Sequence, residues 1–171
     1  MNAKLLKAIV SWAIVAWICK IFLSSLPYKF SQHPDTQHIF GTIGQWMSDT
    51  IAPALGNLFT SFGAYAVGVA ELITSLVLLL PAVLWLLRKI SGGPAFTGRP
   101  GWHALGGLMA SAIMLGAAFF HLFTPLGIEV LHEGKSDGGS LFYAAVSILV
   151  LGIVLFVINR TGRQVADVTD H

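Results

Sequence analysis

Three ionisable side chains interrupt or close long apolar stretches of this sequence: Lys20, Glu71 and His121. A carboxylate inside such a stretch is unfavourable in lipid by roughly 2.5–3.5 kcal/mol, so Glu71 should face protein, water or a partner. Glu71 and His121 are candidate catalytic residues because a carboxylate and an imidazole can act as an acid/base pair. Lys20 would then keep the carboxylate ionised or bind an anion.

Each of these residues also has a structural interpretation. Lys20 could extend to the membrane surface with Glu71 as its counter-ion, and His121 could hydrogen-bond a backbone carbonyl. No nucleophile motif accompanies the three residues, so an enzyme acting alone is not expected. Histidines and glutamates in the loops show neither H-x-x-x-H nor H-E-x-x-H spacing, so we predict no metal site.

The composition is that of a membrane protein. Of the 171 residues, 55% are hydrophobic and 11% are charged, whereas soluble domains usually carry about 25% charged residues. Runs of about 20 apolar residues predict helices that cross the bilayer, and four such spans are expected at about 5–26, 62–87, 103–123 and 141–158. The basic residues mark loops and form no patch for nucleic acid, and the single cysteine, Cys19, excludes an intrachain disulfide.

Two longer segments and one short loop join these spans, at 27–61, 124–140 and 88–102. In the first segment, residues 36–47 have apolar side chains at helical spacing, with Asp35 or Thr36 as a cap. We expect a short amphipathic helix at the membrane interface or over the end of the bundle. A solvated loop is the alternative.

Lysine and arginine predict the orientation, because they mark the cytoplasmic flanks of spans. They lie before the first span, between the second and third, and after the fourth: Lys4, Lys7, Arg88, Lys89, Arg99, Arg160 and Arg163. The other two segments have just Lys29 and Lys135. The sequence therefore predicts an all-α four-helix bundle in a bacterial plasma membrane with both termini cytoplasmic, and it places Lys20, Glu71 and His121 in the outer half.

Helical spacing predicts which faces point into the bundle. On the first span we expect the face with Ala13, Ala16, Trp17, Lys20 and Ser24. On the second we expect the face with Ala64, Gly68, Glu71 and either Thr74 or Ser75. Small residues four apart on the third span, including Gly107 with Ser111, predict close helix packing.

Aromatic residues surround the predicted outer end: Trp17, Phe22, Tyr28, Trp46 and Phe120. They suit a flat hydrophobic ligand such as a quinone or a lipid, and an ordinary interfacial belt of aromatic residues is the alternative. We therefore take Lys20, Glu71, His121, Trp17 and Tyr28 as the candidate ligand-binding residues.

The order of these motifs resembles the DoxX-like family of small four-helix membrane proteins. The resemblance rests on Pro27-Tyr28-Lys29-Phe30 at the end of the first span, His38-Ile39-Phe40, Ala70-Glu71-Leu72-Ile73, His121-Leu122-Phe123, and Asp137-Gly138-Gly139 before the fourth span. It implies a four-helix bundle with both termini inside. Relatives include a subunit of a thiosulfate:quinone oxidoreductase and proteins associated with oxidative stress or sulfur metabolism.

Three functions follow as hypotheses. The first is a membrane-anchor or ligand-binding subunit of a redox or sulfur-metabolism system, with quinone or lipid as ligand in an outward-facing polar pocket. The second is a membrane enzyme that uses Glu71 and His121 as its acid/base pair. The third is a structural assembly partner of a redox protein, or a homo-oligomer that associates through the small residues of the third span.

Overall fold

The computed structural model describes residues 2–93 and 98–160. Pro94 of the predicted inner loop and Arg163 of the basic C-terminal flank lie outside the described residues. The elements are α1 (Ala3–Phe30), α2 (Pro34–Thr50), α3 (Pro53–Ser91), α4 (Arg99–Phe123), β1 (Leu131–His132), β2 (Lys135–Ser136) and α5 (Ser140–Arg160).

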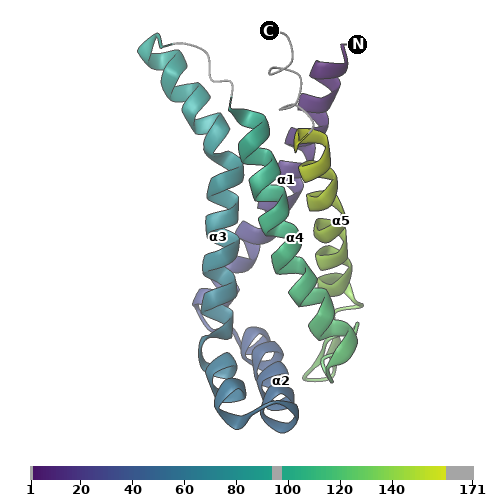
Figure 1. Cartoon of the computed structure of the whole chain (residues 1–171). Helices are drawn as coiled ribbons and strands as arrows, with labels where there is room; N and C mark the ends of the chain where they lie inside the picture. Colours follow the sequence, from purple (N-terminus) through teal and green to yellow (C-terminus); the bar gives the residue numbers. More distant parts are fainter. Residues whose placement is uncertain (1, 94–97, 161–171) are drawn as a thin grey trace, which may run out of the picture.

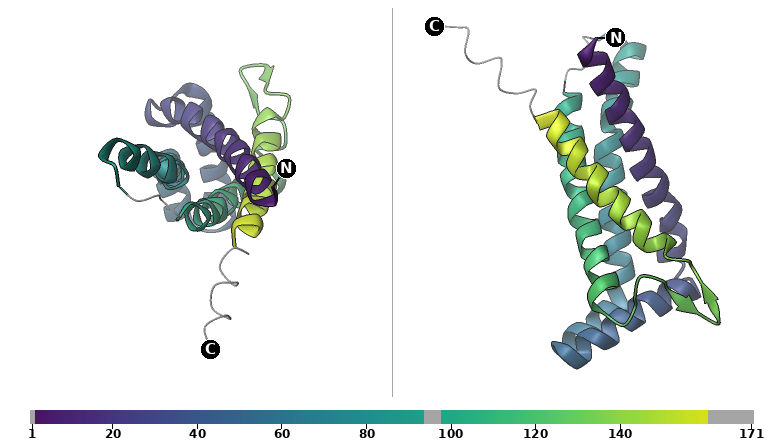
Figure 2. Two further views of the ribbon diagram at one scale, coloured as in Figure 1. Left: turned by 90° about the horizontal axis from the view of Figure 1, so that it is seen from above. Right: turned by 90° about the vertical axis from the view of Figure 1, so that its right-hand side faces the viewer.

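Helices α1, α3, α4 and α5 are each long and apolar enough to cross a membrane. This confirms the predicted all-helical architecture with four apolar helices, and it indicates an integral membrane protein. The four helices run along one another, and α2 lies at the end opposite to the start of α1 and the end of α5 (Figures 1 and 2).

The helices extend beyond the predicted spans. Helix α3 has 39 residues, about 58 Å at 1.5 Å per residue, so it is longer than the roughly 30 Å hydrocarbon core. It begins at Pro53, where the missing N–H of proline would have had no helical partner. Helix α1 continues through Pro27 to Phe30, which brings Lys29 into the helix.

Helix α2 confirms the predicted amphipathic helix and excludes the loop alternative. It buries Thr36, Phe40, Ile43 and Gly44. Gly44 lies against the start of α3, since a Cβ added to Gly44 would meet the Gly56 carbonyl oxygen at 2.8 Å. This close approach fixes α2 against α3 at one end of the bundle.

The prediction of which face of α1 points into the bundle is wrong. Its residues Ala13, Ala16, Trp17, Lys20 and Ser24 are all exposed. The side chains that face the bundle lie on another stripe, formed by Ser11, Ile14, Val15, Ile18, Cys19 and Phe22. Helix α1 is apolar on nearly every side, so its hydrophobic pattern did not distinguish the faces.

The predicted close packing of the third span is confirmed between α4 and α5. A Cβ on Gly107 would lie 2.6 Å from the Gly152 carbonyl oxygen, and the Ser111 hydroxyl donates to the Leu149 carbonyl at 3.0 Å. Gly106, on the neighbouring side of α4, packs against the Leu78 side chain of α3. Gly106, Gly107 and Ser111 therefore contact helices of the same chain.

The segment between α4 and α5 contains a short hairpin. Strands β1 and β2 pair antiparallel through a turn at Glu133 and Gly134, where both residues have positive φ, as tight two-residue hairpin turns require. Asp137 then connects the hairpin to α5. Its carboxylate accepts hydrogen bonds from the backbone N–H groups of Val130, Gly139 and Leu141.

Asp137→Ala is expected to lower the free energy of unfolding by about 0.5–2 kcal/mol, as loss of a helix cap usually does. Partial burial alone would raise the pKa of Asp137, but the backbone N–H groups of Leu141, Gly139 and Val130 and the Ser140 hydroxyl together hold this pKa below its ordinary value. The stabilisation is therefore present above the ordinary pKa and is lost as pH falls through the lowered one. Thermal unfolding of both proteins in detergent should show the difference at neutral pH and a smaller difference in acid; a pH-independent gap would contradict this role.

Candidate functional site

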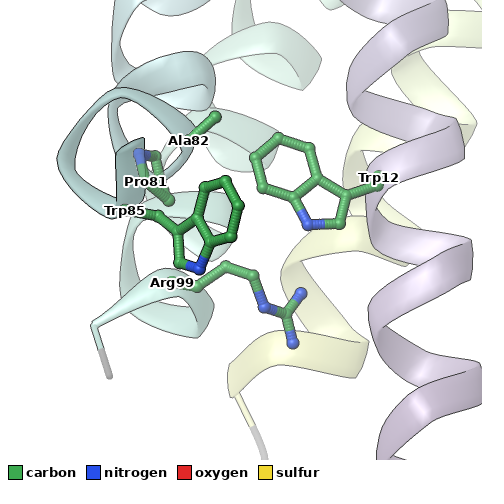
Figure 3. A pocket seen from close by; sticks show the side chains of 5 residues that line it. All are labelled: Trp12, Pro81, Ala82, Trp85 and Arg99. Atoms are coloured by element: carbon green, nitrogen blue, oxygen red, sulfur yellow. The ribbon is translucent and has the colours of Figure 1, made fainter. Parts of the chain in front are cut away.

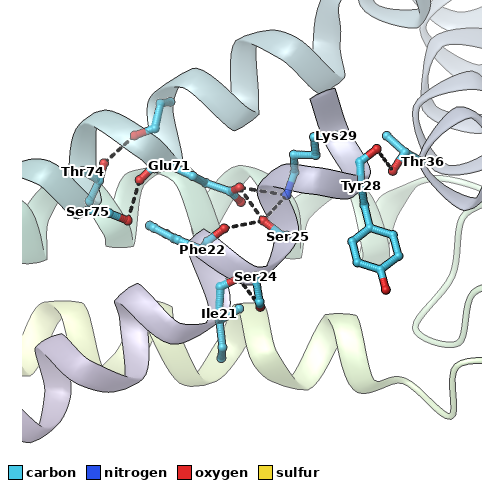
Figure 4. Close-up of polar contacts among 11 residues, drawn as sticks. Ile21, Phe22, Ser24, Ser25, Tyr28, Lys29, Thr36, Glu71, Thr74 and Ser75 are labelled. Carbon is cyan, nitrogen blue, oxygen red and sulfur yellow. Dashed lines mark hydrogen bonds and ion pairs between the residues drawn. The ribbon is translucent and has the colours of Figure 1, made fainter. Parts of the chain in front are cut away.

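Glu71 forms a buried ion pair with Lys29, between α3 and α1. The Lys29 Nζ and Glu71 Oε2 atoms lie 2.8 Å apart, and the two side chains are 15% and 5% exposed. Ser25 completes the cluster, because its hydroxyl lies 2.8 Å from the same carboxylate oxygen and 2.8 Å from the Lys29 ammonium. Figure 4 shows the three side chains pointing toward one another.

Helical spacing and a close approach of two helices create this cluster. Ser25 and Lys29 lie four residues apart, which puts both side chains on one face of α1. Gly68 lies one turn before Glu71 on α3, and a Cβ there would be 3.5 Å from the Lys29 Cβ and 3.2 Å from the Phe30 ring. The face of α3 that was predicted from sequence is buried as expected, at Ala64, Gly68, Glu71, Thr74 and Ser75.

Lys20 and Trp17 lie away from this cluster. Lys20 is exposed, and its Nζ atom lies 5.7 Å from the centre of the Trp17 ring. The Trp17 indole N–H donates to the Ser147 hydroxyl of α5 at 3.0 Å. The lysine that binds Glu71 is therefore Lys29 rather than Lys20.

His121 and Tyr28 also have other partners. His121 is buried, and its Nδ1 atom lies 2.7 Å from the Gly127 carbonyl oxygen. This is the hydrogen bond to a backbone carbonyl that a structural role of His121 would involve. The Tyr28 side chain is exposed and packs edge-on against the His33 ring. The Tyr28 backbone carbonyl accepts a hydrogen bond from the Thr36 hydroxyl. The structure thus places Glu71 with Lys29 and Ser25, and it does not bring Lys20, Trp17, Tyr28 or His121 into that cluster.

Sequence reasoning missed Lys29 because the first span was predicted to end near residue 26. The spacing held part of the signal, although it did not rank the stripe of Lys29 above the stripe of Trp17, Lys20 and Ser24. Ser25 and Lys29 continue the stripe of Ile18 and Phe22 at three- and four-residue steps, which is the period of a helix face. A lysine on this stripe could reach a carboxylate on a neighbouring helix.

A second polar group lies at the end of the bundle that carries α2. Asp35 binds His132 of the hairpin at 2.8 Å and His33 at 3.3 Å, and His38 stacks on His132 with ring centres 4.6 Å apart. The hydrogen bond from His132 is the main cause that lowers the pKa of Asp35, with smaller contributions from the charges of the histidines. These residues tie the hairpin to α2.

A cavity of about 460 Å³ lies beside this group, lined among others by His33, Asp35, His132, Glu133, Lys135 and Asp137. Within residues 2–93 and 98–160, no group of three or more His, Cys, Asp or Glu side chains is arranged to hold a metal ion. The cavity is instead lined by hydrogen-bond donors and acceptors, and these include both acidic and basic side chains.

No protein-family model, curated protein or solved structure matches this chain.

Proposed function

We propose that this chain is a DoxX-like membrane subunit that binds a small hydrophobic ligand, a quinone or a lipid, through the cluster of Lys29, Glu71 and Ser25. The observation that carries the proposal is the burial of this ion pair among apolar helices. A buried ion pair is often less stabilising than well-packed apolar side chains, and ionisable groups inside membranes usually serve function. The subunit would anchor or supply a partner in a redox or sulfur-metabolism system.

The chemistry of the cluster fits the polar head of a quinone. A quinone carbonyl accepts hydrogen bonds, and the Lys29 ammonium has three N–H donors, of which it uses one for Ser25 and one for Glu71. A quinol hydroxyl donates, and the Glu71 carboxylate can accept. The enzyme hypothesis with Glu71 and His121 has weaker support, because Glu71 binds Lys29 while His121 binds a backbone carbonyl.

We also propose that both termini are cytoplasmic. The start of α1, the end of α3, the start of α4 and the end of α5 carry Lys4, Lys7, Arg88, Lys89, Arg99 and Arg160, and basic flanks favour the inside. The ion pair and α2 would then belong to the outer half. A reporter that is active only outside the cell should stay inactive when fused to the C-terminus, and activity there would reverse the orientation.

Thermal unfolding in detergent with short-chain ubiquinone and short-chain menaquinone tests the ligand-binding proposal. Either quinone should raise the melting temperature of the wild-type protein and of Lys20→Met, whose lysine is exposed. Glu71→Gln should lose this shift, because the amide does not keep the Lys29 ammonium in the same charge-assisted contact. An equal shift in Glu71→Gln, or no shift in the wild type with either quinones or bilayer lipids, would contradict the proposal.

A structural role is the second candidate function. Its support is that Lys29, Glu71 and Ser25 satisfy one another, so the cluster could fix the register of α1 against α3 without a ligand. A doubly apolar variant, Lys29→Met with Glu71→Leu, separates the two. Retained folding and retained quinone binding together would assign the cluster to structure alone.

A further inference from the structure

A buried guanidinium nitrogen, with no hydrogen-bond partner among the residues that the structure describes, lies at the other end of the helices. Arg99 is the first residue of α4. Its Nη1 atom is fully buried and has no hydrogen-bond partner among the described residues. A buried donor left unpaired costs about 1–3 kcal/mol, and more when it is charged, so this guanidinium is set to meet an acceptor.

Arg99 lines a cavity of about 290 Å³ together with Trp12 of α1 and with Pro81, Ala82 and Trp85 of α3. Figure 3 shows the guanidinium beside the two indole rings. None of the described lining residues is acidic. Lys89 adds a second cation nearby, since its Nζ atom lies 5.1 Å from the centre of the Trp85 ring. The cavity therefore combines positive charge with apolar and aromatic walls.

His103, one turn after Arg99 on α4, is a second group with buried nitrogen atoms. Its side chain is fully buried, and both ring nitrogens lack a hydrogen-bond partner among the described residues. The ring packs edge-on against Trp12, with centres 4.6 Å apart. Two neighbouring positions of α4 thus bury donors or acceptors around the same tryptophan, which is unusual for a site with a purely packing role.

We propose that this cavity binds the phosphate head of an anionic membrane lipid, with the Arg99 guanidinium on the phosphate and an acyl chain against Trp12 and Trp85. A guanidinium matches phosphate through paired, charge-assisted hydrogen bonds. Tryptophan is enriched at the level of the lipid headgroups in membrane proteins, and the two tryptophans that line the cavity favour a site where a headgroup meets its acyl chains. Anionic lipids are also attracted to basic segments beside membrane helices, and Arg88 and Arg160 lie at this end.

Lipid binding at Arg99 requires membrane insertion, but it does not require the proposed quinone site. Arg99 lies at the start of α4, at the end of the bundle where α1 begins, whereas Lys29 lies near the other end of α1. Loss of lipid binding at Arg99 would leave the Lys29–Glu71 cluster unchanged. Failure of one proposal is therefore visible separately from failure of the other.

Native mass spectrometry of the full chain, purified in detergent with added phosphatidylglycerol or phosphatidylcholine, tests the site. The wild type should retain phosphatidylglycerol in preference to phosphatidylcholine, and Arg99→Gln should bind phosphatidylglycerol about tenfold more weakly, a difference of about 1.4 kcal/mol. Lys7→Gln is the matched control, since it removes an exposed cation at the same end. Equal binding by Arg99→Gln and the wild type would overturn the proposal.

Quenching of tryptophan fluorescence gives a second measurement that needs no change at Arg99. Phosphatidylglycerol with brominated acyl chains should quench the wild type more than brominated phosphatidylcholine does. Trp12→Phe and Trp85→Phe should each remove part of the quenched signal, whereas Trp46→Phe on α2 should not. Quenching that does not depend on Trp12 or Trp85 would contradict the site, and displacement of the lipid by inorganic phosphate would reassign it to a soluble anion.

Discussion

Replacing Lys29 by methionine is expected to destabilise the protein by about 3–5 kcal/mol, because it leaves the Glu71 carboxylate buried without its counter-ion. The carboxylate is 5% exposed and would retain the Ser25 hydroxyl as its hydrogen-bond donor. Unfolding of the purified protein in mixed micelles, followed by circular dichroism, measures this loss. It is the largest effect of a single substitution that we expect.

The neighbouring lysine provides a matched control. Lys20→Met removes the same charge from the same helix, but Lys20 is exposed and contacts the Trp17 ring. We expect this change to alter the free energy of unfolding by less than about 1 kcal/mol. The double variant Lys29→Met with Glu71→Leu should recover most of the stability, since replacing both members of a buried pair by apolar groups is often neutral. Similar losses in Lys29→Met and Lys20→Met would show that the ion pair does not contribute as proposed.

Gly107→Ala is expected to destabilise the protein by about 1–3 kcal/mol, as overpacking usually does. The added Cβ would lie 2.6 Å from the Gly152 carbonyl oxygen and 3.1 Å from the Leu155 Cβ. Because the nearest of these atoms is backbone, α4 and α5 would have to move apart to accommodate the methyl group. The same unfolding measurement in mixed micelles should detect the change.

Gly116→Ala is the control for this prediction. Gly116 lies on the same helix, and a Cβ added there meets nothing within 4 Å among the neighbouring atoms. Alanine should therefore be neutral or stabilising by about 0.4–1 kcal/mol, because it reduces the conformational freedom of the unfolded chain. If Gly107→Ala were as stable as Gly116→Ala, α4 and α5 would be packed less closely than the structure indicates.

The sequence by itself determined the four apolar helices, the amphipathic helix α2 and the buried face of α3. Long apolar runs indicate helices in lipid because an isolated segment there must satisfy its own backbone hydrogen bonds. The face of α3 was predictable because Gly68, Glu71 and Thr74 contrast with the leucines on its other sides. Small residues on α4 predicted close packing, although they could not say which helix would occupy them.

Only the tertiary structure decided which groups meet. Lys20 and Lys29 both lie in the second half of the first helix, so the choice between them depends on where α1 ends and how it is rotated. Helix α1 is apolar on nearly all sides, and the rotation is set by packing: Ile18 and Phe22 are fully buried while Lys20 is exposed. The close approach of α1 to α3 at Gly68 then brings Lys29 to the carboxylate.

The cavity lined by Trp12, Trp85 and Arg99 also depended on tertiary structure, because these residues lie on three different helices. Sequence spacing describes one helix at a time, and it carries no information about the depth or rotation at which separate helices pack. Burial without a hydrogen-bond partner among the described residues, as at Arg99 Nη1 and the His103 ring nitrogens, appears only when the neighbouring helices are in place. The elements of this protein follow from hydrophobicity along the chain, whereas its polar contacts follow from how those helices pack together.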